Sequence, residues 1–332
     1  MEEGFDLWAN PSSPHAEGRK ARAALEDARE RVKQALGWEG EVIFTSGASE
    51  AIAIGMQRSK HTRKIVSTVE HDAVFRAAPN AESLALSEPP LVRAEGLEAV
   101  LGTGEPAVVA VQHINSETGV VQPIYELLPV TREHGSLLLC DCSQSAGKDE
   151  LPDCDMAIVS AHKLGGPIGI GALLVRDFSL LEPIGGHERG YRQGTENLPA
   201  ALGFAAALEA RGSDYLQHDE RIADLLCDLA DLVADSGGQM VDAGGSTSMF
   251  IRAIAMPKMS GSAQVMRFDM AGIAISQGSA CSSGTMKTSR VLDAMGIPVE
   301  VAVNTIRMSV GWNTTREEVE RFCEVWLELA KA

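Results

Sequence analysis

Apolar and polar positions alternate in two different ways along the first two thirds of the chain. Residues 18–36 repeat apolar side chains at spacings of three and four, which predicts an amphipathic helix. Short apolar runs, typical of strands, follow at 42–45, 65–69, 107–113, 136–140, 156–160 and 170–175. The segments between them predict helices at 49–58, 123–134 and 197–211. Alternation of such strands with helices indicates an α/β fold with a mostly parallel sheet flanked by helices on both faces.

The pattern changes after Gly203. The expected elements are a long helix at about 199–236, strands near 247–255 and 271–276, a helix near 286–295, a strand near 304–310 and a final helix from Thr315. We therefore predict a large α/β domain at 12–205 and a smaller α+β domain at 206–332. Residues 1–11 are expected to pack with the smaller domain.

Composition and charge exclude several classes of protein. The 332 residues carry a net charge of −17, which argues against direct binding of nucleic acid, because phosphate contacts need clustered Lys and Arg. No apolar run reaches the roughly 18 residues of a membrane span, and the N-terminus lacks a signal-type segment, so we expect a cytoplasmic protein. The six cysteines have no metal-ligand spacing and suggest no disulfide framework, so no metal site is expected.

A lysine stands where the apolar run at 156–160 ends, followed by two glycines, Gly165 and Gly166. Lys163, held at the mouth of a dry site, would lose hydration, which lowers its pKa and makes the amine nucleophilic. Such an amine suits a Schiff base with an aldehyde, and the aldehyde cofactor most used in this way is pyridoxal phosphate. The alternative is a surface lysine at a strand end.

Two further strand ends carry groups that suit this cofactor. Asp141 ends the run at 136–140, where a carboxylate can keep a pyridine nitrogen protonated or simply cap a helix. The turn at 45–50 opens a helix and exposes backbone N–H groups that suit a phosphate. Ser49 in that turn offers a hydroxyl, or serves as the N-cap of the helix.

Three other polar residues have both a functional and a structural interpretation. His71 follows the run at 65–69 and can cover a flat ring or move protons, or be a loop histidine. Asn115 offers an amide to a substrate or cofactor oxygen, or only shapes a turn. Arg307 lies inside an apolar strand and needs a carboxylate partner, from a substrate or from an internal ion pair.

Small polar residues surround Cys281 in the stretch 276–284, without helical or strand periodicity. An exposed cysteine on such a loop is an oxidation hazard, so its presence favours a reactive nucleophile. A loop of this kind suits a sulfur carrier.

Seven motifs, in order, resemble the cysteine desulfurases of the class V aminotransferase group, which are fold-type I pyridoxal phosphate enzymes. The resemblance extends from about Asn10 to the C-terminal helix. Its motifs are Thr45-Ser46-Gly47-Ala48-Ser49-Glu50, Asn115-Ser116-Glu117-Thr118-Gly119, Asp141-Cys142-Ser143-Gln144, Ser160-Ala161-His162-Lys163, Arg192-Gln193-Gly194-Thr195-Glu196-Asn197, Gly278-Ser279-Ala280-Cys281 and Ile306-Arg307-Met308-Ser309.

The resemblance implies a site for pyridoxal 5'-phosphate. Lys163 binds the aldehyde and shuttles protons, Asp141 pairs with the pyridine nitrogen, His71 stacks on the ring, and Gln144 contacts the ring oxygen. The residues implied to hold the phosphate are Ala48, Ser49, Ser160, His162 and, from the other subunit of a homodimer, Thr195.

The resemblance also implies the reaction. Arg307 and Asn115 bind the carboxylate of L-cysteine, and Cys281 takes its sulfur as a persulfide while alanine leaves. The long serine- and glycine-rich stretch around Cys281 is similar to the subgroup that serves iron–sulfur assembly, which implies a protein sulfur acceptor or scaffold as partner. Alternatives are an aminotransferase or selenocysteine lyase of the same group, or a non-catalytic assembly protein.

The chain departs from the family pattern in three places. It begins within what is a later helix in the family, without the usual N-terminal strand and small-residue turn, which affects the expected substrate-entry region. Gly165 stands where relatives commonly have an aromatic residue, and Ser49 where threonine is usual.

Overall fold

The computed structural model describes residues 1–7, 9–242, 244, 246–278 and 289–331, without the side chains of 211–221. The chain divides into two units: Met1–Leu84, Val92–His113 and Pro123–Ser213 form the first, and Ala85–Leu91, Ile114–Gln122 and Asp214–Ala332 form the second.

Both predicted domain limits differ from this division. Residues 1–11 fall in the first unit, where Gly4 is packed directly against Pro199. The boundary after residue 213 lies within one uninterrupted helix, α7 (Leu198–Asp235), so no change of periodicity marks it in the sequence.

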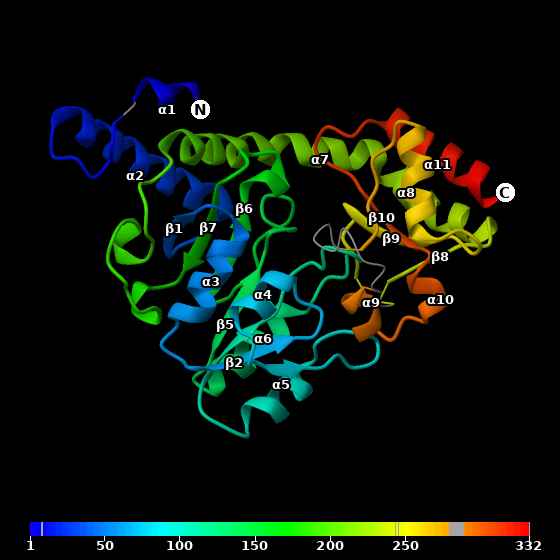
Figure 1. Ribbon diagram of the computed structural model, residues 1–332, viewed down its shortest axis with the longest axis horizontal. Helices are drawn as coiled ribbons and strands as arrows, with labels where there is room; N and C mark the ends of the chain where they lie inside the picture. Colours follow the sequence, from blue (N-terminus) through cyan, green and yellow to red (C-terminus); the bar gives the residue numbers. More distant parts are fainter. Residues whose placement is uncertain (8, 243, 245, 279–288, 332) are drawn as a thin grey trace. The chain divides into compact units, whose positions relative to one another are not determined.

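The first unit contains a seven-stranded sheet with the strand order β1-β7-β6-β5-β4-β2-β3 (Figure 1). Its strands are β1 (Glu41–Thr45), β2 (Arg63–Ser67), β3 (Glu82–Leu84), β4 (Ala107–Ala110), β5 (Leu137–Asp141), β6 (Met156–Ser160) and β7 (Gly171–Val175). The neighbours from β3 to β6 pair in parallel, whereas β7 pairs antiparallel with both β6 and β1. The predicted α/β fold with a mostly parallel sheet is confirmed.

The helices of the first unit agree with the sequence pattern where the apolar face is long. They are α1 (Glu2–Asp6), α2 (Ala16–Leu36), α3 (Ala48–Arg58), α4 (Asp72–Ala77), α5 (Ala94–Leu101) and α6 (Ile124–Glu133), together with the first part of α7. The expected helices at 18–36, 49–58 and 123–134 are therefore confirmed. The short α4 and α5 were not predicted, because each buries only two apolar side chains.

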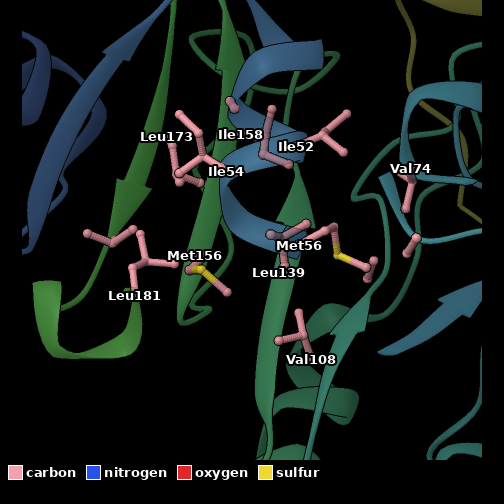
Figure 2. Close-up of a cluster of buried hydrophobic side chains, with 14 of the residues drawn as sticks. Ile52, Ile54, Met56, Val74, Val108, Leu139, Met156, Ile158, Leu173 and Leu181 are labelled. Atoms are coloured by element: carbon pink, nitrogen blue, oxygen red, sulfur yellow. The ribbon is translucent and has the colours of Figure 1, made fainter. Parts of the chain in front are cut away.

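Helix α3 lies directly on the sheet, as Figure 2 shows. Its fully buried Ile52 and Met56 belong to one cluster with Leu139, Ile158 and Leu173 from three strands. The approach is so close that a Cβ atom at Gly55 would lie 2.3 Å from Cδ1 of Leu139. Because interiors are close-packed, this contact fixes the position of α3 on the strands beneath it.

The second unit has a three-stranded antiparallel sheet in the order β10-β9-β8. Its remaining elements are β8 (Gln239–Met240), β9 (Ile251–Ala255), α8 (Gly261–Met270), α9 (Arg290–Ala294), α10 (Val299–Ala302), β10 (Thr305–Ser309) and α11 (Arg316–Ala330). Its core includes Phe268 stacked on Phe322, with ring centroids 4.9 Å apart, and the fully buried Trp326. The predicted strands near 247–255 and 304–310 are confirmed as β9 and β10.

The predicted strand at 271–276 is wrong. Ile273 and Ile275 pack on the core from an extended segment, and only Ser276 pairs with the sheet, through an isolated bridge to Arg307.

The expected helix near 286–295 is present as α9 in its described part. The final helix begins as expected after Thr315, whose side chain caps it. Among the described helices, none combines the length and apolar character needed to cross a membrane.

Candidate active site

Lys163 lies in a single turn of 3₁₀ helix (Ala161–Leu164) that follows β6 directly. Gly165 ends this turn with φ +81°, in the left-handed region that favours glycine. The turn projects Lys163 outward, and its side chain is exposed. The described part of the chain therefore does not bury Lys163, and it does not supply the loss of hydration that the sequence predicts for this side chain.

Asp141 is the last residue of β5, as predicted. His71 follows β2 and stands at the start of α4. One carboxylate oxygen of Asp141 accepts a hydrogen bond from the Ser143 N–H at 2.9 Å, which fixes the side chain at the strand end. His71 caps α4, and its Nδ1 accepts from the Ala73 N–H at 3.1 Å, so the neutral ring carries its proton on Nε2. Burial lowers the pKa of His71, Lys163 acts in the same direction, and Asp141 opposes them. His71 is thus within electrostatic range of both Asp141 and Lys163.

The predicted phosphate turn has the expected geometry. Helix α3 begins at Ala48 after Gly47, so Gly47 is the N-cap and the alternative of a capping Ser49 is wrong. The backbone N–H groups of Ala48 and Ser49, in the first turn, have no intrahelical acceptor, and this end of the helix carries partial positive charge. Such an end is suited to an anion.

The turn that carries Lys163 contributes two more of the predicted phosphate residues. The Oγ of the buried Ser160 and Nδ1 of His162 are 3.0 Å apart. Burial and the neighbouring Lys163 both lower the pKa of His162. Gln144 lies half-buried in the turn after β5.

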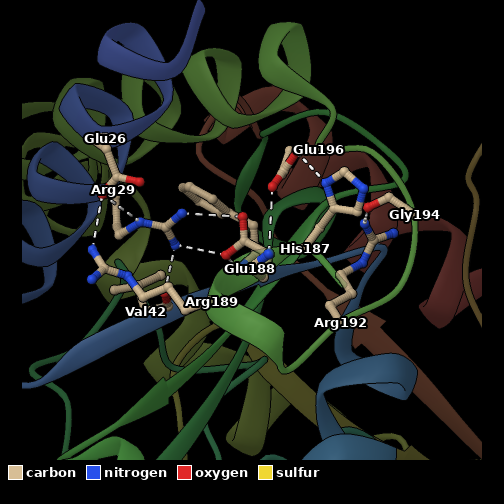
Figure 3. A network of polar contacts seen from close by, with 10 residues as sticks. Glu26, Arg29, Val42, His187, Glu188, Arg189, Arg192, Gly194 and Glu196 are labelled. Carbon is tan, nitrogen blue, oxygen red and sulfur yellow. Dashed lines mark hydrogen bonds and ion pairs between the residues drawn. The ribbon is translucent and has the colours of Figure 1, made fainter. Parts of the chain in front are cut away.

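Thr195 is exposed, in the segment 184–197, and a polar network holds this segment in place (Figure 3). Nε of Arg192 lies 3.1 and 3.2 Å from the two carboxylate oxygens of Glu50, and His187 lies 3.0 Å from Glu196. The segment bearing Thr195 is therefore tied directly to the first turn of α3.

The same network includes a buried ion pair that sequence reasoning missed. Glu188 accepts from Arg29 Nη1 at 2.8 Å, from Arg29 Nη2 at 3.1 Å and from the Phe44 N–H at 2.8 Å. Glu188 has φ 46°, a left-handed conformation that costs energy and persists only where surrounding contacts impose it. One signal was available, because Arg29 interrupts the apolar face of helix 18–36 between Leu25 and Val32.

The second unit contains the predicted substrate residues. The side-chain oxygen of Asn115 accepts from the Glu117 and Thr118 N–H groups, both at 2.9 Å, so it shapes the turn, as the structural alternative proposed. Arg307 donates to the Ser116 carbonyl at 2.8 Å and to Oγ of Ser276 at 3.1 Å. Its Nε is buried without a hydrogen-bond partner in the described structure. Burial lowers the pKa of Arg307, which the negative charge of Glu117 opposes.

Cys281 lies outside the described residues, so the structure does not test its predicted role. Among the described cysteines, Cys140, Cys142 and Cys154 are buried and free, and burial raises the pKa of the Cys140 thiol well above its usual value. A thiol of this kind is a poor nucleophile, so these residues do not compete for the role predicted for Cys281.

The sequence matches the Aminotransferase class-V family over residues 2–322. It is 32% identical to "Cysteine desulfurase IscS 1" of Archaeoglobus fulgidus, over 96% of this chain and 88% of that protein. The fold is similar to that of a NifS-like protein from Rickettsia africae, with a TM-score of 0.86 and 27% identity over 100% of this chain and 95% of that one. It is also similar to SspA in complex with cysteine, with a TM-score of 0.73 and 29% identity over 92% and 91% of the two chains.

Proposed function

Because the chain belongs to the class-V aminotransferase family and, within it, to the cysteine desulfurases, we propose that it removes sulfur from L-cysteine with pyridoxal 5'-phosphate as cofactor. The observation that carries the proposal is the placement of these groups in one sheet: Asp141 ends β5, Lys163 follows β6, and His71, which follows β2, lies within electrostatic range of both.

The residues present fit this cofactor. The phosphate needs hydrogen-bond donors, which the first turn of α3 supplies at Ala48 and Ser49 and which Ser160 and His162 supply beside Lys163. The ring needs a carboxylate at its nitrogen and a flat partner, which Asp141 and His71 provide. Once bound, the cofactor supplies an electron sink that stabilises negative charge next to the substrate amine.

The residues of the first unit have separate tasks. Lys163 binds the cofactor aldehyde through Nζ and moves protons to and from the substrate carbons. Asp141 keeps a proton on the pyridine nitrogen, and the Ser143 N–H holds its carboxylate in position. His71 presents a neutral ring, with Nδ1 occupied by the α4 backbone and Nε2 protonated.

The second unit binds the substrate and accepts its sulfur. Arg307 holds the carboxylate of L-cysteine, and its buried Nε hydrogen finds an acceptor there. The Cys281 thiolate attacks the substrate sulfur, an S–S bond forms and the Cβ–S bond breaks. Protonation at Cβ gives L-alanine and leaves a persulfide on Cys281, so the reaction consumes no external oxidant or reductant.

We propose further that the enzyme is a homodimer in which Thr195 contributes to the partner's phosphate site. The exposure of Thr195 on a firmly held segment supports this arrangement. The persulfide sulfur then passes to a protein acceptor, which for this type of enzyme we expect to serve iron–sulfur cluster assembly.

One experiment tests the function. The purified protein, loaded with pyridoxal phosphate, is mixed with L-cysteine, and alanine is measured together with the visible absorption of the cofactor. We expect one alanine per cysteine consumed, loss of cofactor binding as a Schiff base in Lys163→Ala, and no persulfide in Cys281→Ser. Absence of alanine from the loaded wild-type protein would refute the proposal. Alanine and sulfide formation that survives in Cys281→Ser would instead indicate a lyase.

A further inference from the structure

Glu188 lies against the free edge of β1, the strand that leads into the predicted phosphate turn. Strand β1 is an outer strand of the sheet and pairs with β7 on one side only. On its other side, the Phe44 N–H donates to Glu188 at 2.8 Å. Two residues earlier, the Val42 carbonyl accepts from Arg29 at 2.5 Å. Because alternate residues of a strand direct their backbone groups to the same side, the ion pair takes the place of a further strand here.

The ion pair of Glu188 and Arg29 is almost completely buried. The side chain of Glu188 is 1% exposed and that of Arg29 is 3% exposed. A buried charge-assisted pair has few alternative arrangements, because most of them would leave a charge unpaired in the interior. The carboxylate of Glu188 is therefore fixed relative to α2, which carries Arg29, and to β1.

Residues 187–192 form a closed loop that connects this anchor to Arg192 (Figure 3). The backbones of His187 and Arg192 pair in both directions, with N···O distances of 2.8 and 3.3 Å. Within the loop, the Tyr191 N–H donates to the Glu188 carbonyl at 3.1 Å, and Glu188 has φ 46°. A glutamate adopts this left-handed conformation only where its surroundings impose it. The buried bonds of the Glu188 side chain supply that constraint.

Arg192, at the end of this loop, reaches the first turn of α3. Its Nε lies 3.1 and 3.2 Å from the two carboxylate oxygens of Glu50. Glu50 follows Ser49 directly, so a carboxylate lies next to the N–H groups proposed to hold the phosphate. A carboxylate at that place repels a phosphate unless a cation lies beside it. The position of Arg192 therefore bears directly on phosphate binding.

We propose that Glu188 is a positioning residue for the cofactor phosphate: it anchors the loop 187–192 so that Arg192 stays on Glu50. The inference rests on the proposed function, because it takes pyridoxal phosphate to bind at the first turn of α3. Without the Glu188 carboxylate the loop loses its buried attachment to β1, and the guanidinium spends less time beside Glu50. The unpaired charge of Glu50 then weakens phosphate binding, whereas Lys163 still binds the aldehyde.

The test compares pyridoxal phosphate with pyridoxal, which lacks the phosphate but keeps the aldehyde that Lys163 binds. Titration of the full-length apoprotein, followed by absorption, gives both affinities. In Glu188→Ala the affinity for pyridoxal phosphate should fall about fivefold, the order expected for repulsion between partly screened charges. The affinity for pyridoxal should change by less than about twofold. Glu209→Gln, which weakens an exposed two-bond ion pair with Arg31 of α2, is the matched control and should change neither affinity.

A Glu50→Gln background distinguishes positioning from a general loss of structure. In that background Arg192 has no charge to neutralise, so Glu188→Ala should lower the affinity for pyridoxal phosphate by less than about twofold. A merely structural role of Glu188 would give the same fivefold loss in both backgrounds. A further readout needs no cofactor, because hydrogen exchange of the peptide 187–197 in the apoprotein should be faster in Glu188→Ala than in the wild type.

A milder variant covers the case in which Glu188→Ala fails to fold. Glu188→Gln keeps an oxygen that can accept from the Phe44 N–H but loses the charge-assisted bonds with Arg29. It should bind pyridoxal phosphate about threefold more weakly than the wild type and pyridoxal equally well. Glu50→Gln should again cancel the difference.

Four results would overturn the inference: wild-type affinity for pyridoxal phosphate in both Glu188 variants, equal losses for pyridoxal phosphate and pyridoxal, a loss that persists in full in the Glu50→Gln background, or unchanged hydrogen exchange of the peptide 187–197. Failure of the proposed function is distinguishable, because the wild-type protein itself would then form no Schiff base with pyridoxal phosphate or release no alanine from L-cysteine.

Discussion

Arg192 binds both carboxylate oxygens of Glu50, at 3.1 and 3.2 Å from Nε, in the first turn of the helix proposed to hold the cofactor phosphate. Glu50 also accepts from the Ser46 N–H at 2.5 Å. Burial alone would raise the pKa of Glu50, but the bonds from Ser46 and the charge of Arg192 lower it below its ordinary value. The carboxylate is thus ionised close to the place where a dianionic phosphate is expected, and Arg192 neutralises it.

The first prediction follows from this neutralisation. Arg192→Ala should weaken the binding of pyridoxal phosphate about tenfold, because Glu50 would repel the phosphate at a distance where partly buried charges interact by about 1 kcal/mol or more. Titration of the apoprotein with cofactor, followed by absorption, measures the effect. Glu50→Gln in the same background should recover most of the affinity. Arg31→Ala, which breaks an ion pair with Glu209 outside this turn, is the control. Equal affinity of Arg192→Ala and wild type would contradict the prediction.

Asp141→Asn should separate cofactor binding from turnover. Asparagine still accepts from the Ser143 N–H but cannot keep a proton on the pyridine nitrogen. We expect near-normal cofactor content and an alanine-forming rate lower by about tenfold to hundredfold, the range for losing a charge-assisted hydrogen bond. The pKa of His71 should also fall, because Asp141 is one of the groups that raise it. Nuclear magnetic resonance of the histidine ring protons measures that shift, and a rise would show that the two residues do not interact as described.

The stability of the fold should depend on pH through His113. Burial lowers the pKa of this side chain from 6.5 to about 4, and its Nδ1 has no hydrogen-bond partner in the described structure. The unfolded chain therefore binds a proton that the folded chain does not at any pH between these two values. Stability is complete above about pH 6.5 and is lost as the pH falls toward 4, by about 3 kcal/mol in total.

Urea unfolding of the wild type and His113→Leu at pH 7.5 and pH 5 checks this dependence. Because carboxylates also titrate at low pH, the informative quantity is the difference between the two proteins. The free energy of unfolding of His113→Leu should decrease less on going to pH 5 than that of the wild type. Equal decreases in the two proteins would exclude His113 as the source.

The fold could be predicted where apolar residues follow a regular pattern. It was harder to predict where the pairing of the backbone determines whether a segment is a strand. The strands β5 and β6 are continuous apolar runs, and so their ends at Asp141 and near Lys163 were located from the sequence. The extended segment with Ile273 and Ile275 has the same apolar character but pairs with the sheet only at Ser276, and no local pattern records the absence of a partner strand.

Sequence motifs name candidate site residues, but they do not name the residues that hold those candidates in place. Motifs identify groups that act on a ligand, whereas Glu188 binds Arg29, 159 residues away, and Glu117 binds Ser289, 172 residues away. Such long-range pairs appear only when the topology is known. Asn115 shows the converse, since a residue expected to face a ligand uses its side-chain oxygen to hold its own turn.

The buried pair of Arg29 and Glu188 should be one of the most costly interactions to break in the first unit. Their side chains are 3% and 1% exposed, and the same carboxylate satisfies the Phe44 N–H of β1. Glu188→Ala leaves the Phe44 N–H without its acceptor and leaves the buried Arg29 guanidinium with only Glu26 and the Val42 carbonyl as described partners, so we expect a loss of about 3–5 kcal/mol in the free energy of unfolding.

A double-mutant cycle measures the interaction itself. The double variant Arg29→Met with Glu188→Gln retains an acceptor for the Phe44 N–H and buries no net charge. Its loss in the free energy of unfolding should therefore be smaller than the summed losses of the two single variants. The expected difference is about 1 kcal/mol or more, as for other contacting residues. The exposed pair of Lys20 and Glu17, 62% and 65% exposed, provides the control, and Lys20→Ala should cost no more than about 0.5 kcal/mol. Additive losses at Arg29 and Glu188 would mean that each side chain is stabilised by its other contacts. The left-handed backbone at Glu188, and with it the segment that presents Thr195, would then be held chiefly by Arg192 and His187.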